Sequence, residues 1–282
     1  MSKKILFCAA LVLAISQRRK FMPEIVAQRM FQPIYILLDS VFLVALCAML
    51  FFRRRYLTLL FGLFGGILYF VVDYGIFHLW LGTRSIEGGS LFWVLLWMSL
   101  SYGVTNFVLI WTWISKDENA REWTLFILLW WFVCPLLTDA LGNGDVIKIQ
   151  RTTGAYHGWM AAILFLSYAA LILFNIFRKD KSLRFPLLRL FLIGVFVQFG
   201  WELSLLIGGI RSAGIESAAD KLTVLLVNSL LETNLGMPLI YIIFLLITSV
   251  FTEDLKRRGG KVTLSERLKE NLAEGSLKAE KA

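Results

Sequence analysis

Two acidic residues interrupt long apolar runs of this sequence and are the first candidates for chemistry. Asp73 lies in the stretch GGILYFVVDYGIFHLWLG, and Glu202 lies in GVFVQFGWELSLLIGGIR. A charged side chain at the centre of a membrane helix costs about 3 kcal/mol or more, so such a group is expected to face a bundle interior or a watery cavity. We therefore predict that both carboxylates reach one pocket, where they could bind a cation, a proton or a cationic solute.

Other polar side chains lie at helical spacing from acidic residues. One turn separates Gln198 from Glu202, and one turn separates Asn228 from Glu232, so each glutamate has an amide on its own helix face. Asp73 and His78 are five residues apart, about 140° around an α-helix, so they are not expected to pair. The residues predicted to bind a substrate or a proton are Asp73, His78, Asn106, Gln198, Glu202, Asn228, Glu232 and Asn234.

The strongest candidates also have a purely structural interpretation. Glu202 and Glu232 could act as polar clamps between helices. Asp73 could accept a hydrogen bond from Ser101 or Asn106 of the neighbouring helix and serve only to hold the two helices together. The sequence alone does not choose between these interpretations and the functional ones.

The remaining ionisable residues of the apolar runs are assigned no role. Asp39 and Asp139 lie near run ends, where we expect simple solvation, and His157 is expected to be interfacial. We predict no metal and no cofactor, because two histidines are too few for a histidine-rich zinc site and no phosphate-binding loop or dinucleotide fingerprint occurs. No residue is assigned as catalytic.

The elements that would position these residues are transmembrane helices. Hydrophobic residues make up 58% of the chain, well above the soluble norm of about 45 to 50%. An apolar run of about 20 residues crosses a bilayer as a helix, and none of the runs has the alternation of a barrel strand. We predict an all-α integral membrane bundle with seven runs, near residues 33–52, 57–81, 90–115, 122–142, 156–177, 186–209 and 222–250.

Basic residues predict the orientation of the bundle. The ends of the first, third, fifth and seventh runs carry clusters such as Arg53-Arg54-Arg55, whereas Arg84, Arg151 and Arg211 are scattered over the opposite loops. The positive-inside rule then predicts a multi-pass cell-membrane protein with a cytoplasmic C-terminus. The net charge of +9 is explained by this asymmetry and by attraction to anionic lipid, so no nucleic-acid partner is expected.

The two halves of the chain can be aligned on their polar residues. Asp73 lies over Glu202, and the segment Ser101–Asn106 (SYGVTN) lies over Ser229–Asn234 (SLLETN). This match predicts two parallel three-helix repeats joined by a linker helix, a 3+1+3 arrangement. The predicted segments are 1–32, a signal peptide or a short uncleaved helix with an amphipathic segment; 33–115, the first repeat; 116–155, the linker helix and an outer loop; 156–252, the second repeat; and 253–282, a cytoplasmic tail.

This arrangement resembles, in architecture, the sugar transporters of the SWEET type. Their proline-glutamine element is missing here, since Pro33 only begins the first run and the fifth run has no proline. Neither residue roles nor a sugar substrate are therefore carried over. Our first hypothesis is a small-solute or ion-coupled transporter, with Pro135 and Pro238 as helix breaks or hinges.

A second hypothesis is an intramembrane enzyme. The segment Gln198-Phe199-Gly200-Trp201-Glu202 resembles the Trp-Glu element of the small seven-helix meroterpenoid cyclases, which implies a carboxylic acid that protonates a lipophilic substrate. A wall of aromatic faces could then stabilise a carbocation. The third hypothesis is a structural or sensor protein. The expected partners are the bilayer and a small-molecule or ion ligand, and the oligomeric state is left open.

Overall fold

The computed structural model describes residues 28–151, 156–179 and 184–250. The predictions of a signal peptide or N-terminal helix and of a C-terminal tail helix fall on residues 1–27 and 251–282, outside the described residues. Seven described helices are long and apolar enough to cross a membrane, which confirms a multi-pass helical membrane protein. The helices are α2 (Pro33–Phe52), α3 (Tyr56–Phe70) continued by η2 (Val71–Trp80), α4 (Leu91–Ile114), α5 (Ala120–Leu141), α6 (His157–Phe177), α7 (Leu187–Ile207) and α8 (Ala218–Val250).

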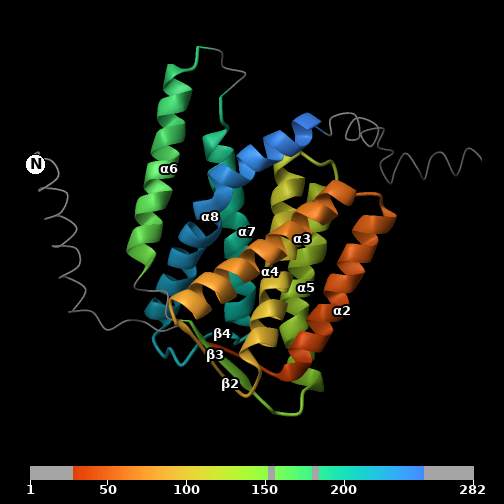
Figure 1. The fold of residues 1–282 in the computed structure, drawn as a ribbon. Helices are drawn as coiled ribbons and strands as arrows, with labels where there is room; N and C mark the ends of the chain where they lie inside the picture. Colours follow the sequence, from red (N-terminus) through yellow and green to blue (C-terminus); the bar gives the residue numbers. More distant parts are fainter. Residues whose placement is uncertain (1–27, 152–155, 180–183, 251–282) are drawn as a thin grey trace, which may run out of the picture.

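Helix α4 forms the centre of the bundle and α6 lies at its periphery (Figure 1). In α4, 83% of the most apolar window is buried inside the protein, compared with 0% for α6. Glycine allows the close approach of α3 to α4, because a Cβ on Gly103 would lie 2.5 Å from the Cα of Gly66. Gly65 and Gly66 of α3 therefore form the contact with α4.

The second part of the second span, η2, is a π-helix, which the sequence did not predict. In an α-helix, residues five positions apart point about 140° away from each other. In a π-helix, hydrogen bonds join residues five positions apart, so these residues lie nearly one above the other. In η2 this winding brings Val72 and Phe77 to the same cavity as Asp73. The sequence-based angle between Asp73 and His78 assumed an α-helix and was wrong for this segment.

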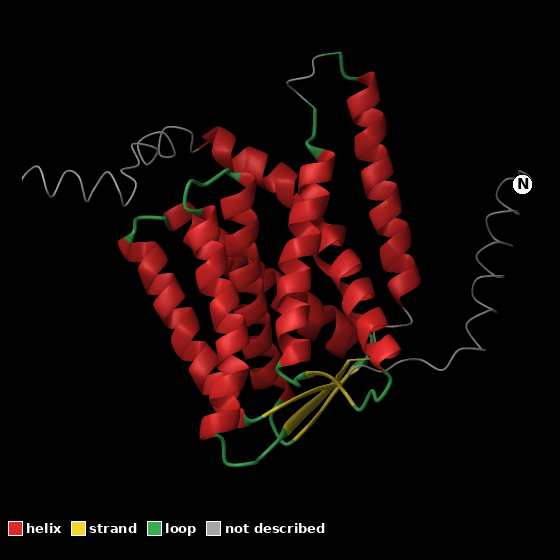
Figure 2. Ribbon diagram, turned by 180° about the vertical axis from the view of Figure 1, so that it is seen from behind, coloured by secondary structure: helices red, strands yellow, loops and turns green. Residues whose placement is uncertain are grey.

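Four short strands form one antiparallel sheet across one end of the bundle (Figure 2). The strands are β1 (Gln28–Phe31), β2 (Arg84–Glu87), β3 (Ile147–Arg151) and β4 (Arg211–Ala213), in the order β2-β3-β1-β4. Alternation along β1 and β3 buries every second side chain against the helices. We call this element the end sheet. The sequence-based prediction treated β2, β3 and β4 as loops and placed β1 in the N-terminal segment 1–32.

The end sheet defines the two ends of the bundle. Strands β1 and β3 precede α2 and α6, whereas the basic cluster Arg53-Arg54-Arg55 follows α2 at its other end. Under the predicted orientation, the end sheet therefore lies on the outer side of the membrane. The orientation itself stays a prediction.

Candidate functional site

Each strand of the end sheet contributes one arginine to the bundle interior. Arg29, Arg84 and Arg211 are 2%, 5% and 7% exposed, and Arg151 is partly buried. In the sheet register, Arg84 lies opposite Arg151 and Arg29 lies opposite Arg211. Like charges directly opposite each other destabilise a sheet unless an anion lies between them.

A carboxylate from the helices contacts both arginines of each pair. Asp73 Oδ1 lies 2.7 Å from Arg84 Nε and 3.2 Å from Arg151 Nη2. Glu202 Oε1 lies 3.4 Å from Arg29 Nη2, and its Oε2 lies 2.9 Å from Arg211 Nε. The last contact is an ion pair rather than a well-aligned hydrogen bond. Both carboxylates are thus already paired with cations, so the geometry does not favour a further cation beside either of them.

Burial acts on these arginines without removing their charge. Burial, helped by the neighbouring Arg211, lowers the pKa of Arg29 to about 10. Burial and Arg151 likewise lower the pKa of Arg84 to about 10. For Arg151, burial opposes the charged form, but Asp73 and Glu232 outweigh it and raise the pKa above its usual value. All three guanidinium groups therefore remain cationic at neutral pH.

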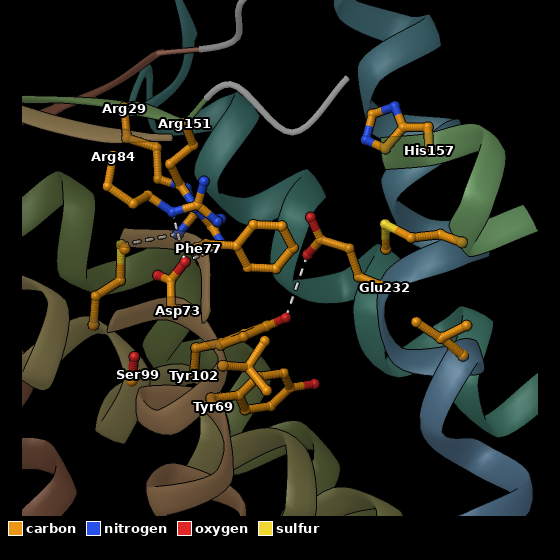
Figure 3. A pocket seen from close by; sticks show the side chains of 14 residues that line it. Arg29, Tyr69, Asp73, Phe77, Arg84, Ser99, Tyr102, Arg151, His157 and Glu232 are labelled. Atoms are coloured by element: carbon orange, nitrogen blue, oxygen red, sulfur yellow. Dashed lines mark hydrogen bonds and ion pairs between the residues drawn. The ribbon is translucent and has the colours of Figure 1, made fainter. Parts of the chain in front are cut away.

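A cavity of about 140 Å³ lies beneath the end sheet (Figure 3). We call it the polar chamber. Its arginines come from β1, β2 and β3, and its apolar and aromatic wall comes from α3, η2, α4, α6 and α8. The lining residues are Arg29, Tyr69, Val72, Asp73, Phe77, Arg84, Met98, Ser99, Tyr102, Arg151, His157, Met160, Glu232 and Leu235.

Glu232 is the second carboxylate of the polar chamber and has a different environment from Asp73. Tyr102 Oη donates a hydrogen bond to Glu232 Oε2 at 3.3 Å, and Gln198 Nε2 donates another at 2.9 Å. Among the described residues, no arginine lies within ion-pair distance of this carboxylate. Thr233 Oγ1 donates to Gln198 Oε1 at 2.6 Å and fixes the orientation of the amide. Glu232 is therefore held by neutral donors, facing the chamber.

The structure brings together only some of the predicted site residues. Asp73 and Glu232 line the polar chamber, and Gln198 links Glu232 to Glu202, with its Nε2 3.5 Å from Glu202 Oε1. Glu202 is fully buried beside the chamber rather than lining it. We predicted that Asp73 and Glu202 share one pocket. In the structure Asp73 shares the chamber with Glu232, and Glu202 lies next to the chamber.

The other predicted site residues do not line the polar chamber. Asn106 and Asn234 are fully buried, and neither side-chain amide has a hydrogen-bond partner among the described residues. Asn228 is buried at 3% exposure, and His78 contacts Tyr74, with ring centroids 5.3 Å apart. No arrangement of three or more His, Cys, Asp or Glu side chains able to hold a metal occurs in the part of the chain that the structure describes.

Two residues that were given no role differ from expectation. Asp39 was expected to be solvated but is 1% exposed, and it accepts hydrogen bonds from the indoles of Trp97 at 3.0 Å and Trp130 at 2.9 Å. The indole N–H groups are neutral donors. Asp39 is therefore buried with hydrogen bonds from two indoles and, among the described residues, without an ion pair. His157, expected to be interfacial, lines the polar chamber, whereas Asp139 is exposed as predicted.

The four arginines are the site residues that sequence reasoning missed. They were counted as scattered loop charges, or as part of the N-terminal segment, because strands of three to five residues give little periodicity. One signal was present in the sequence, since Arg84 follows Asp73 by 11 positions and Arg211 follows Glu202 by nine.

Comparisons with known proteins do not narrow the function. No protein-family model, no curated protein and no solved structure matches this chain.

Proposed function

We propose that this protein is an intramembrane enzyme that transfers protons on a lipophilic substrate, with Glu232 as the proton-carrying group. The observation that supports this proposal most strongly is that Glu232 lines the polar chamber and that, among the described residues, its direct hydrogen-bond partners are the neutral groups of Tyr102 and Gln198. A carboxyl group held only by neutral donors can exchange its proton with a substrate, whereas a carboxylate held by two guanidinium groups is kept ionised. Glu232, and not Glu202 of the Trp-Glu element, is therefore the proposed acid and base.

The charge around the chamber narrows the chemistry. Three arginines line the chamber, so a carbocation beside them would be repelled, and the arrangement favours a neutral or anionic intermediate. In the proposed reaction, the Glu232 carboxylate takes a proton from one carbon of the substrate and the resulting acid returns it to another carbon. The substrate is isomerised, and no oxidant or reductant is consumed.

The walls of the chamber fit a substrate that enters from the bilayer. Tyr69, Phe77 and Tyr102 provide aromatic faces, and Met160 of the peripheral helix α6 completes the wall on that side. Next to Tyr102, Gly103 of α4 packs directly against Gly65 and Gly66 of α3, which closes the space between these two helices. A chamber with its arginines at one end and an apolar and aromatic wall suits catalysis more than passage through the bundle.

A small-solute transporter is the second candidate, because the arrangement of the end sheet supports the proposed 3+1+3 repeat. The end sheet has the symmetry expected of two repeats. If β1 and β3 exchange labels, and β2 and β4 do the same, the strand order β2-β3-β1-β4 becomes β4-β1-β3-β2, which is the same order read from the other edge. The same exchange turns the pair Arg29–Glu202 into Arg151–Asp73 and the pair Arg211–Glu202 into Arg84–Asp73. Parallel repeats of this kind occur in transporters. We rank transport second because ion pairs join the two halves of the molecule. Arg29 of the first half contacts Glu202 of the second, and Arg151 of the second contacts Asp73 of the first. These contacts would resist a rocking motion of one half against the other.

The test is untargeted mass spectrometry of cell pellet and medium. Cells would express the wild type, Glu232→Gln, or Asp139→Asn, which alters an exposed carboxylate, at equal membrane levels. We expect a lipophilic compound in wild-type and Asp139→Asn cells that is absent with Glu232→Gln. Unchanged compounds redistributed between pellet and medium would instead support the transporter, and equal profiles in all three strains would contradict both.

A further inference from the structure

We infer that the three end-sheet arginines that line the polar chamber, Arg29, Arg84 and Arg151, form a binding site for an oxyanion, and that the ligand of the chamber is a membrane amphiphile with a phosphate-type headgroup. This inference rests on the proposed function in that it names the polar end of the same substrate. Its evidence is separate, because it concerns the arginines and not Glu232.

The first step is the balance of charge at the sheet. Four buried or partly buried arginines lie close to three carboxylates, those of Asp73, Glu202 and Glu232, so positive charge is in excess. Buried charge without a counter-charge is unfavourable, and an anion beside these arginines would relieve it. Protonation of Glu232 during the proposed reaction would increase the excess.

The second step is the number of unused donors. Asp73 accepts from Arg84 Nε and from Arg151 Nη2, but Arg84 Nη2 and Arg151 Nε are buried and have no hydrogen-bond partner among the described residues. Arg29 Nε is unpartnered in the same way, in a side chain that is 3% exposed. Buried polar groups are nearly always satisfied, so each orphaned donor indicates a missing acceptor.

The third step is the position of these guanidinium groups. All three line the chamber, and Arg84 lies over the ring of Phe77 with its Cζ 4.5 Å from the ring centroid, which fixes its orientation (Figure 3). Guanidinium groups bind phosphate and carboxylate oxygens through paired N–H donors. The opposite wall is apolar and aromatic, so a headgroup at the arginines would place an alkyl chain along Tyr69, Met160 and Leu235.

The experiment measures binding of dodecyl phosphate to the purified protein in nanodiscs by intrinsic tryptophan fluorescence. Inorganic phosphate and uncharged dodecanol are the comparison probes. The matched variants are Arg84→Gln, in the chamber, and Arg211→Gln, which removes the corresponding arginine of the other pair and does not line the chamber. We expect Arg84→Gln to weaken dodecyl phosphate binding about tenfold or more and Arg211→Gln to change it less than threefold, because charge-assisted hydrogen bonds are roughly twice as strong as neutral ones.

A second variant keeps the test valid if Arg84→Gln does not fold. Arg84→Lys retains the charge beside Asp73 but loses the fork of donors, so it is expected to fold and to bind several-fold more weakly. Equal binding of inorganic phosphate would assign the site to a free anion and overturn the amphiphile. Equal affinity in Arg84→Gln and wild type, or no binding of any phosphate probe, would overturn the site itself.

The same experiment separates this inference from the proposed reaction. Glu232→Gln removes a negative charge from the chamber, so it should bind dodecyl phosphate at least as tightly as the wild type while forming no product. Loss of product together with retained binding supports both claims. Failure of binding with a Glu232-dependent product would overturn the headgroup assignment alone.

Discussion

At the scale of single residues, the environment of a carboxylate determines what it can do. Asp73 is held by two guanidinium groups, Glu232 by a tyrosine and an amide, and Asp39 by two indoles. The first is paired with cations, the second faces the chamber and is the proposed proton carrier, and the third is enclosed away from the chamber. Three acids of similar appearance in the sequence thus have three different environments.

Asp39 provides a stability prediction at this scale. Asp39→Ala would leave the buried indole N–H groups of Trp97 and Trp130 without acceptors, so we expect the free energy of unfolding to fall by about 2 to 4 kcal/mol. Asp39→Asn keeps one acceptor oxygen and should lose less. The measurement is unfolding in mixed micelles, and Asp139→Ala, at an exposed position, should stay within about 0.5 kcal/mol of the wild type. Equal stability of all three variants would show that the indoles do not depend on Asp39.

At the scale of elements, the spans could be predicted from the sequence, whereas the end sheet could not. The seven apolar runs give long helices because length and hydropathy suffice to identify them. A strand such as Arg211–Ala213 has three residues, and its pairing with Gln28 and Arg29 depends on contacts far apart in the chain. The candidate carboxylates were found because acids are rare in apolar runs, but their arginine partners looked like ordinary loop charges.

The close packing of α3 on α4 gives a prediction at this scale. In Gly103→Ala the added methyl group would lie 2.5 Å from the Cα of Gly66, so the helices must separate, and we expect a loss of about 1 to 3 kcal/mol in the free energy of unfolding. The matched control is Gly75→Ala in η2, where an added Cβ meets nothing within 4 Å. Equal effects of the two substitutions on detergent unfolding would contradict the described packing.

At the scale of the whole molecule, the end sheet joins segments that are far apart in the described chain. Strand β1 pairs with both β3 and β4, and Arg29 of β1 reaches Glu202 of α7. Breaking a buried ion pair by removing one partner costs about 3 to 5 kcal/mol, so these contacts favour a rigid structure at the end of the bundle that carries the sheet. A rigid chamber keeps Glu232, the arginines and the aromatic wall in fixed positions, as proton transfer to a bound substrate requires.

The most direct test of proton transfer at Glu232 uses purified protein in vesicles made from host-membrane lipids and suspended in D₂O. Glu232 carries the abstracted proton between the two transfers of one turnover, and a carboxylic acid can exchange that proton with deuterium from the solvent. We therefore predict deuterium at carbon in one lipid class, detected by mass spectrometry. Incorporation should be present with the wild type and with Asp139→Asn and absent with Glu232→Gln. Incorporation that is unchanged in Glu232→Gln, or none with any variant, would contradict the account.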